Sequence, residues 1–114
     1  MQSFNLNDLV ADSELNDRRW KEFFRNSSLS MGLYRLKRGQ IDEQKPHAED
    51  EVYLVISGDA SFRAGDQVQL VGPGTLLFVE RHLEHRFFDI MEDLAVLVFF
   101  APPEGSLKIK NIRA

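Results

Sequence analysis

Residues 46–58 read Pro-His-Ala-Glu-Asp-Glu-Val-Tyr-Leu-Val-Ile-Ser-Gly and join ligand-type polar side chains to an apolar run. Residues 52–56 are apolar and rich in β-branched side chains, which predicts a β-strand. Ser57-Gly58-Asp59 then predicts a turn. Because side chains alternate across a strand, His47 and Glu51 share one face if the strand begins early. The stretch therefore predicts a strand whose first residues carry metal-ligand chemistry.

Strand-like segments separated by turn signals continue on both sides of this stretch. Ala64-Gly65-Asp66 predicts a hairpin, and Gly72-Pro73-Gly74 predicts a further turn. Residues 20–24 fit either a strand or a short helix, and residues 5–16 fit a short helical turn or a loop with capping residues. Many short strands at this spacing indicate an all-β sandwich or barrel. We expect the strands at residues 29–34, 52–56, 61–63, 67–71, 75–79, 85–90 and 94–100.

The 114 residues are predicted to form a single domain. We expect residues 29–103 to form the barrel, residues 1–28 to form an N-terminal segment that packs on it, and residues 104–114 to form a C-terminal tail. The tail fits an extra strand, a dimer arm or a loose end. Because exposed sheet edges need covering, we expect a homodimer, with residues 29–36 or the tail at its interface.

Composition excludes several classes of protein. The chain has no cysteine, which excludes a disulfide scaffold, a thiolate metal site and a cysteine nucleophile. Its net charge of −4 gives it no general attraction to nucleic acid. No apolar run approaches the ~20 residues of a membrane span, and the N-terminus lacks the basic and apolar regions of a signal peptide. We therefore expect a cytoplasmic protein whose partner is a small molecule rather than nucleic acid or a membrane.

The chain has only three histidines, at positions 47, 82 and 85. His85 begins a predicted strand, and His47 and Glu51 stand at the start of another. Two imidazoles and a carboxylate are a sensible ligand set for non-haem Fe(II), and the same set suits Zn or Mn. On residue type and strand parity alone this trio is a weak signal, because three histidines and many acids offer such a set by chance.

The stretch that contains His47 and Glu51 resembles the first motif of the cupin superfamily. That motif reads H-x-H, three or four residues, E, six residues, G. His47, Glu51 and Gly58 stand at the positions of its second histidine, its glutamate and its glycine. Lys45 stands where the first histidine of the family belongs, and a protonated lysine is a poor metal ligand.

The stretch that contains His85 resembles the second cupin motif, which reads G, five residues, P-x-G, two residues, H, three residues, N. Gly74 and His85 fit these offsets, and Asp89 replaces the asparagine. Glu80 and His82 replace the proline and the glycine, so the turn before His85 is expected to differ. The resemblance covers roughly residues 29–102, which is most of the chain.

This resemblance implies a double-stranded β-helix, or jelly-roll barrel, with a metal site in its mouth. It implies His47, Glu51 and His85 as ligands of one divalent first-row transition metal, either Fe, Mn, Ni or Zn. Gln44 is a candidate for a fourth, weak oxygen ligand. The alternative is that the same polar residues are hydrogen-bonded in a barrel without metal, since cupins of that kind exist.

Two functions follow from this interpretation. The first is a small metalloenzyme of the dioxygenase, isomerase or lyase type, acting on a small oxygen-rich or acidic metabolite. Its catalytic candidates are Tyr53, which otherwise is a core tyrosine, and His82, which otherwise is an exposed loop histidine. The second is a non-catalytic binding or sensory module for a sugar or an acid, with no metal or a structural one. Fold alone does not choose among these chemistries.

Overall fold

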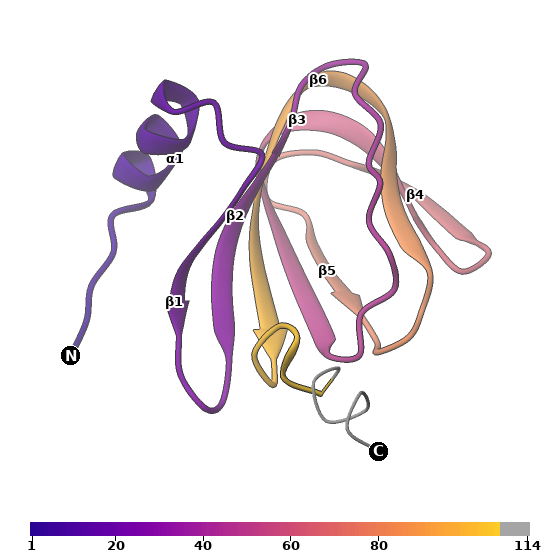
Figure 1. Cartoon of the computed structure of the whole chain (residues 1–114). Coiled ribbons are helices and arrows are strands. Elements are labelled where there is room, and N and C mark those ends of the chain that lie inside the picture. Colours follow the sequence, from indigo (N-terminus) through magenta and orange to yellow (C-terminus); the bar gives the residue numbers. More distant parts are fainter. Residues whose placement is uncertain (108–114) are drawn as a thin grey trace.

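The computed structural model describes residues 1–107, and Figure 1 shows their arrangement as one short helix beside a curved antiparallel sheet. No helix within these residues is long and apolar enough to cross a membrane. The elements are α1 (Leu6–Leu15), β1 (Trp20–Arg25), β2 (Ser30–Leu36), β3 (Asp50–Ala64), β4 (Gln67–Val71), β5 (Leu76–Val79) and β6 (His85–Ala101).

The two longest strands of the curved sheet, β3 and β6, pair with each other along most of their length. The strand order is β1-β2-β6-β3-β4, and β5 pairs with β3 outside this path. Residues 51–54 of β3 pair with β5, whereas residues 60–64 pair with β4. The pairing of β3 with β6 shifts register between these two regions, and such irregularities bend a strand. The all-β jelly-roll barrel predicted from the sequence is confirmed.

The turn predicted at residues 57–59 does not break the chain. The strands predicted at residues 52–56 and 61–63 form one strand, β3, and those predicted at residues 85–90 and 94–100 form one strand, β6. At residues 57–59 the register shifts explain the difference, because a glycine in a bulge gives the same local signal as a glycine in a turn. Gly58 has a φ of +95°, and its Cα faces the backbone of the opposite strand at Leu94.

Residues 20–24, which fitted a strand or a short helix, form strand β1, and β1 pairs with β2. The indole of Trp20 lies over Gly32 in β2, where a β-carbon would overlap the ring. Trp20 also makes edge-to-face contacts with Tyr34 and Phe100. Gly32 therefore makes room for a large aromatic side chain at one end of the barrel.

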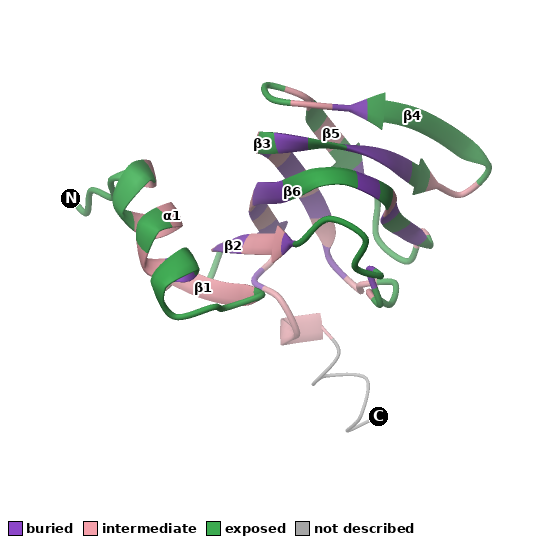
Figure 2. Ribbon diagram, turned by 90° about the horizontal axis from the view of Figure 1, so that it is seen from above, coloured by how far each residue is buried: buried purple, intermediate pink, exposed green. Residues whose placement is uncertain are grey.

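The barrel interior holds the core, as Figure 2 shows by the buried segments of β3 and β6. Burial alternates along the first half of β3, as expected for a strand with one face inside. Tyr53 and Phe87 are completely buried and pack edge to face. The remaining large members of this cluster are Leu36, Val55, Phe62, Val71, Val79, Ile90, Leu94, Val96, Val98 and Phe100.

Hydrogen bonds cap helix α1 and tie the chain after β6 to β2. Residues 5–16 fitted a short helical turn or a loop with capping residues, and residues 6–15 form helix α1, which begins after Asn5, whose side chain accepts a hydrogen bond from the Asp8 N–H. After β6 the chain turns back toward β2, where the Glu104 N–H donates to Ser30 Oγ. The guanidinium of Arg25 donates to the Glu104 carbonyl. The predictions for residues 108–114 of the tail lie outside the described residues.

Candidate metal centre

His47, Glu51 and His85 come together at one end of the barrel. One nitrogen or oxygen from each side chain lies within 4.8 Å of the others. Glu51 lies near the start of β3 and His85 at the start of β6, and both side chains are buried. His47 precedes β3, so strand alternation does not place it. Its carbonyl accepts a hydrogen bond of 2.7 Å from the His82 N–H, which fixes this loop against the turn before β6.

The contact between Glu51 and His85 is unusual for a buried pair. Glu51 Oε1 lies 3.1 Å from His85 Nε2, but the two atoms are not aligned as a hydrogen bond, and neither they nor Glu51 Oε2 have a hydrogen-bond partner. His85 Nδ1 lies 2.8 Å from the Leu83 carbonyl. A carbonyl only accepts, so the ring proton belongs on Nδ1, and Nε2 of the neutral ring then faces the carboxylate with a lone pair.

Two acceptors at this distance need a positive charge between or beside them. One source is a second proton on His85. Burial is the largest single influence on the pKa of His85 and lowers it, but the contacts with Glu51 and the Leu83 carbonyl and the charges of Glu51 and Asp42 outweigh it and raise that pKa. The other source is a metal ion, which takes deprotonated nitrogen and oxygen ligands. The donor chemistry and the orphaned buried atoms fit a divalent ion.

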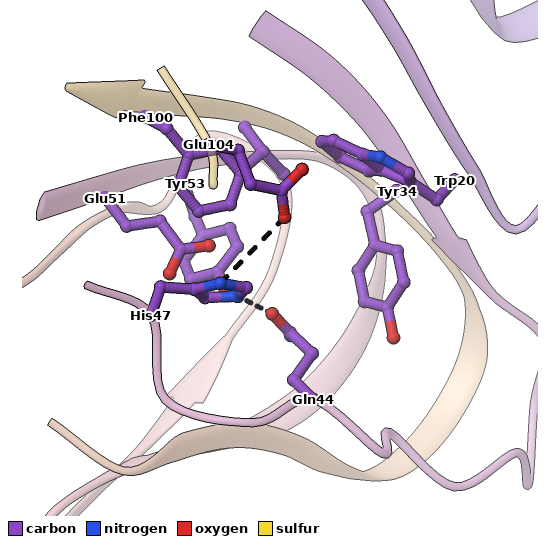
Figure 3. A pocket seen from close by; sticks show the side chains of 9 residues that line it. Trp20, Tyr34, Gln44, His47, Glu51, Tyr53, Phe100 and Glu104 are labelled. Atoms are coloured by element: carbon purple, nitrogen blue, oxygen red, sulfur yellow. Dashed lines mark hydrogen bonds and ion pairs between the residues drawn. The ribbon is translucent and has the colours of Figure 1, made fainter. Parts of the chain in front are cut away.

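A cavity of about 160 Å³ is lined in part by two of these three residues, His47 and Glu51. Figure 3 shows Trp20 and Tyr34 on one side of it and His47 with Glu51 on the other. The remaining lining residues are Gln44, Tyr53, Val98, Phe100 and Glu104. Ligand pockets for drug-sized molecules run to ~300–1,000 Å³, so this one suits a ligand of few atoms.

Gln44, the candidate fourth ligand, is held by a hydrogen-bond network around Asp42. Gln44 Nε2 donates to Asp42 Oδ2 at 2.8 Å, and Gln44 Oε1 accepts from the Tyr53 hydroxyl at 2.9 Å. Asp42 also accepts from the Tyr34 hydroxyl at 2.6 Å and from the Phe87 N–H at 2.9 Å. The network therefore turns the amide oxygen of Gln44, and not its nitrogen, toward the Tyr53 side of the cavity.

Tyr53 is completely buried, and its hydroxyl donates to Gln44 within this network. Burial, and next to it the charge of Glu51, raise the pKa of Tyr53 well above its ordinary value. Tyr53 therefore acts as a neutral hydrogen-bond donor at neutral pH.

The other residues that the sequence singled out lie away from the cavity. His82 is exposed and is not among the lining residues. Its φ of +65° places it in the left-handed region, which suits the glycine that the second motif has there. Lys45 is exposed, and Glu49 is buried with Oε1 accepting from the Gly105 N–H.

Sequence reasoning missed two residues of the site. Asp42 lies in the long polar loop before β3, where no spacing marks it. Glu104 follows Pro102-Pro103 and reaches the cavity only because the chain turns back over β2, and its Oε2 lies 3.9 Å from His47 Nδ1. Burial first, and then the charges of Glu22, Glu51 and Glu49, raise the pKa of Glu104, while Arg25 opposes them.

Fold and site together define a small jelly-roll barrel with a His/Glu/His cluster in its mouth. A sequence model of the cupin domain matches residues 32–100. The chain is 44% identical over 105 residues to an uncharacterized protein of Streptomyces coelicolor. The aligned region covers 92% of this chain and 100% of the relative. The chain belongs to the cupin family.

Solved structures give the same fold. The crystal structure of TT1209 from Thermus thermophilus is 26% identical, with a TM-score of 0.71 and coverage of 90% of this chain and 99% of that one. The DMSP lyase DddQ from Ruegeria pomeroyi is 21% identical, with a TM-score of 0.65 and coverage of 73% of this chain and 47% of that one. At this identity the lyase shows the fold alone.

Proposed function

We propose that this cupin binds one divalent first-row transition metal (Fe, Mn, Ni or Zn) through His47, Glu51 and His85. We further propose that it is a metalloenzyme of the dioxygenase, isomerase or lyase type that acts on a small oxygen-rich metabolite. When bound, such an ion polarises an oxygen substrate or activates dioxygen or water. The solved lyase supports this proposal only by showing that a barrel of this fold hosts an enzyme.

The observation that carries the proposal is the Glu51–His85 contact. A buried carboxylate and a buried imidazole nitrogen, here Nε2 of His85, that lack hydrogen-bond partners are costly unless a cation is shared between them. The third candidate ligand, His47, stands within reach of both and borders the cavity. A ligand set of three leaves coordination positions for water or substrate on the cavity side.

The chain's own residues supply the rest of the site. Gln44 is a candidate for a further oxygen ligand, since its Oε1 has a second lone pair besides the one that accepts from Tyr53. Tyr53 can donate a hydrogen bond to a bound oxygen by releasing Gln44. His82 is the weaker catalytic candidate because it lies outside the cavity lining.

Metal content tests the proposal, with the third histidine as a matched control. We expect the purified untagged protein, loaded anaerobically, to hold about one ion per chain by elemental mass spectrometry. His47→Ala and His85→Ala are expected to lose it with the fold kept by circular dichroism, because each removes one of three ligands. His82→Ala also removes a histidine and is expected to keep the ion.

If the wild-type protein takes up none of the four ions, the metalloenzyme proposal is wrong. The alternative of a non-catalytic binding module would then apply. If the metal is present, screens for oxygen consumption, isomerisation and elimination would separate the three reaction types.

A further inference from the structure

The charges around the cavity are one-sided. Among the nine described residues that line it are two carboxylates, Glu51 and Glu104, and no lysine or arginine. Arg25 contacts this segment, but its guanidinium donates to the Glu104 carbonyl and to Glu22 Oε1 rather than to the Glu104 carboxylate. A ligand in this cavity therefore meets two carboxylates, and no lysine or arginine side chain of the described residues lines the cavity beside them.

The backbone of Glu104 is held in place while its carboxylate faces the cavity. Its N–H donates to Ser30 Oγ at 2.9 Å, and the next N–H, that of Gly105, donates to Glu49 Oε1 at 3.1 Å. The distance of 3.9 Å to His47 Nδ1 is that of an ion pair and exceeds hydrogen-bond length. The Glu104 carboxylate therefore retains the capacity to accept hydrogen bonds from, or to pair with, a ligand.

Aromatic rings line the side of the cavity away from Glu51. Trp20 and Tyr34 lie there with ring centroids 6.4 Å apart. Phe100 joins this side to the metal-ligand cluster, because its ring centroid lies 6.2 Å from that of Trp20 and 4.9 Å from that of His47. Figure 3 shows the carboxylate of Glu104 between His47 and the rings of Trp20 and Tyr34. Aromatic faces beside a carboxylate are the chemistry that recognises alkylated ammonium groups.

The net charges at the metal-ligand cluster and at Glu104 differ in sign. A divalent ion beside the single charge of Glu51 leaves one positive charge, which an anionic oxygen donor would neutralise. Glu104 leaves one negative charge on the side of His47 that faces Trp20 and Tyr34, which a cation would neutralise. A ligand with two acidic groups would place its second charge against Glu104, and that repulsion is costly where water is excluded.

We propose that the cavity takes a small zwitterion, with a carboxylate toward His47, Glu51 and His85 and an alkylated ammonium group between Glu104, Trp20 and Tyr34. This inference rests on the proposed function for the metal end and deepens it by naming the substrate class. It assigns Glu104 as a specificity-determining residue.

Two isosteric probes test the inference. Trimethylglycine and 3,3-dimethylbutyrate have the same shape and the same carboxylate, and they differ in one atom, a quaternary nitrogen against a carbon. The carboxylate of trimethylglycine is the less basic, so metal coordination alone favours 3,3-dimethylbutyrate. By calorimetry on the metal-loaded protein, we expect trimethylglycine to bind at least roughly tenfold more tightly, from cation–π and charge attraction.

Glu104→Gln is expected to reduce this preference to within about threefold, because the amide keeps the shape and removes the charge. Glu22→Gln is the matched control, since Glu22 is a neighbouring carboxylate outside the cavity lining, and it is expected to retain the preference. The wild-type comparison needs no variant, so the test stands even if Glu104→Gln folds poorly.

Every other result overturns the inference. Equal binding of the two probes, tighter binding of 3,3-dimethylbutyrate, binding of neither, or an unchanged preference in Glu104→Gln would each do so. Metal content is measured on the same samples. A protein that holds its ion but lacks the preference refutes only the ligand class, whereas a protein without an ion refutes the proposed function.

Discussion

Replacing Asp42 with alanine is expected to lower the free energy of unfolding by about 3–5 kcal/mol, a large share of the ~5–15 kcal/mol of a typical domain. Asp42 is 4% exposed and accepts hydrogen bonds from Tyr34, Gln44 and the backbone of Phe87. Alanine would leave these donors buried without an acceptor, and an unsatisfied buried donor costs more than a hydrogen bond gains. Urea denaturation followed by fluorescence measures the loss.

Glu43→Ala is the matched control for this variant. Glu43 is the next residue, it is exposed, and its replacement also removes one negative charge. We expect a change within about 0.5 kcal/mol, as is usual for surface positions. Asp42→Asn is expected to fall between the two, because the amide keeps one acceptor oxygen. Equal stability of Asp42→Ala and Glu43→Ala would show that the network does not support the fold.

Replacing Gly58 with alanine is the second large effect, at about 2–5 kcal/mol of lost stability. Its φ of +95° is strained for any residue with a β-carbon. The added β-carbon would also overlap the Asp93 carbonyl oxygen and approach Leu94 Cα to 2.7 Å. These are backbone atoms of the facing strand β6, so a side-chain rotation cannot relieve the contact.

Gly74→Ala separates the two causes, because Gly74 has a φ of +88° but open space around its Cα. This variant is expected to lose only the conformational part, about 1–2 kcal/mol. Guanidinium denaturation of both variants at unchanged m-value gives the difference. If Gly74→Ala is as damaging as Gly58→Ala, the close packing of β3 on β6 at this bulge does not limit stability.

The fold was predictable because its signals are local. The β-branched run at residues 52–56, the hairpin at residues 64–66 and the motif spacings each depend on neighbouring residues, and the structure has strands there. Strand length was predicted wrongly at β3 and β6. At Gly58 in β3 the reason is that whether a glycine marks a turn or a bulge depends on the strand opposite it. That partner, around Asp93 and Leu94, is distant in sequence.

The site was predictable only in part, because some of its residues are brought together from distant parts of the sequence. The grouping of His47, Glu51 and His85 followed from the cupin resemblance, and the structure brings them together. The positions of Trp20, Tyr34 and Glu104 in the cavity could not be predicted. These residues come from β1, β2 and the segment after β6, which meet only in the folded barrel. Asp42 likewise reaches Phe87 across 45 residues of chain.

Anomalous diffraction from crystals of the zinc-loaded protein tests the metal site most directly. We predict one peak at the zinc edge in the barrel mouth, ~2.0–2.2 Å from a nitrogen of His47, from Nε2 of His85 and from a carboxylate oxygen of Glu51. His85 Nδ1 should keep its contact with the Leu83 carbonyl. A loaded crystal with no peak at this position, or with zinc held only by other residues, would contradict the account.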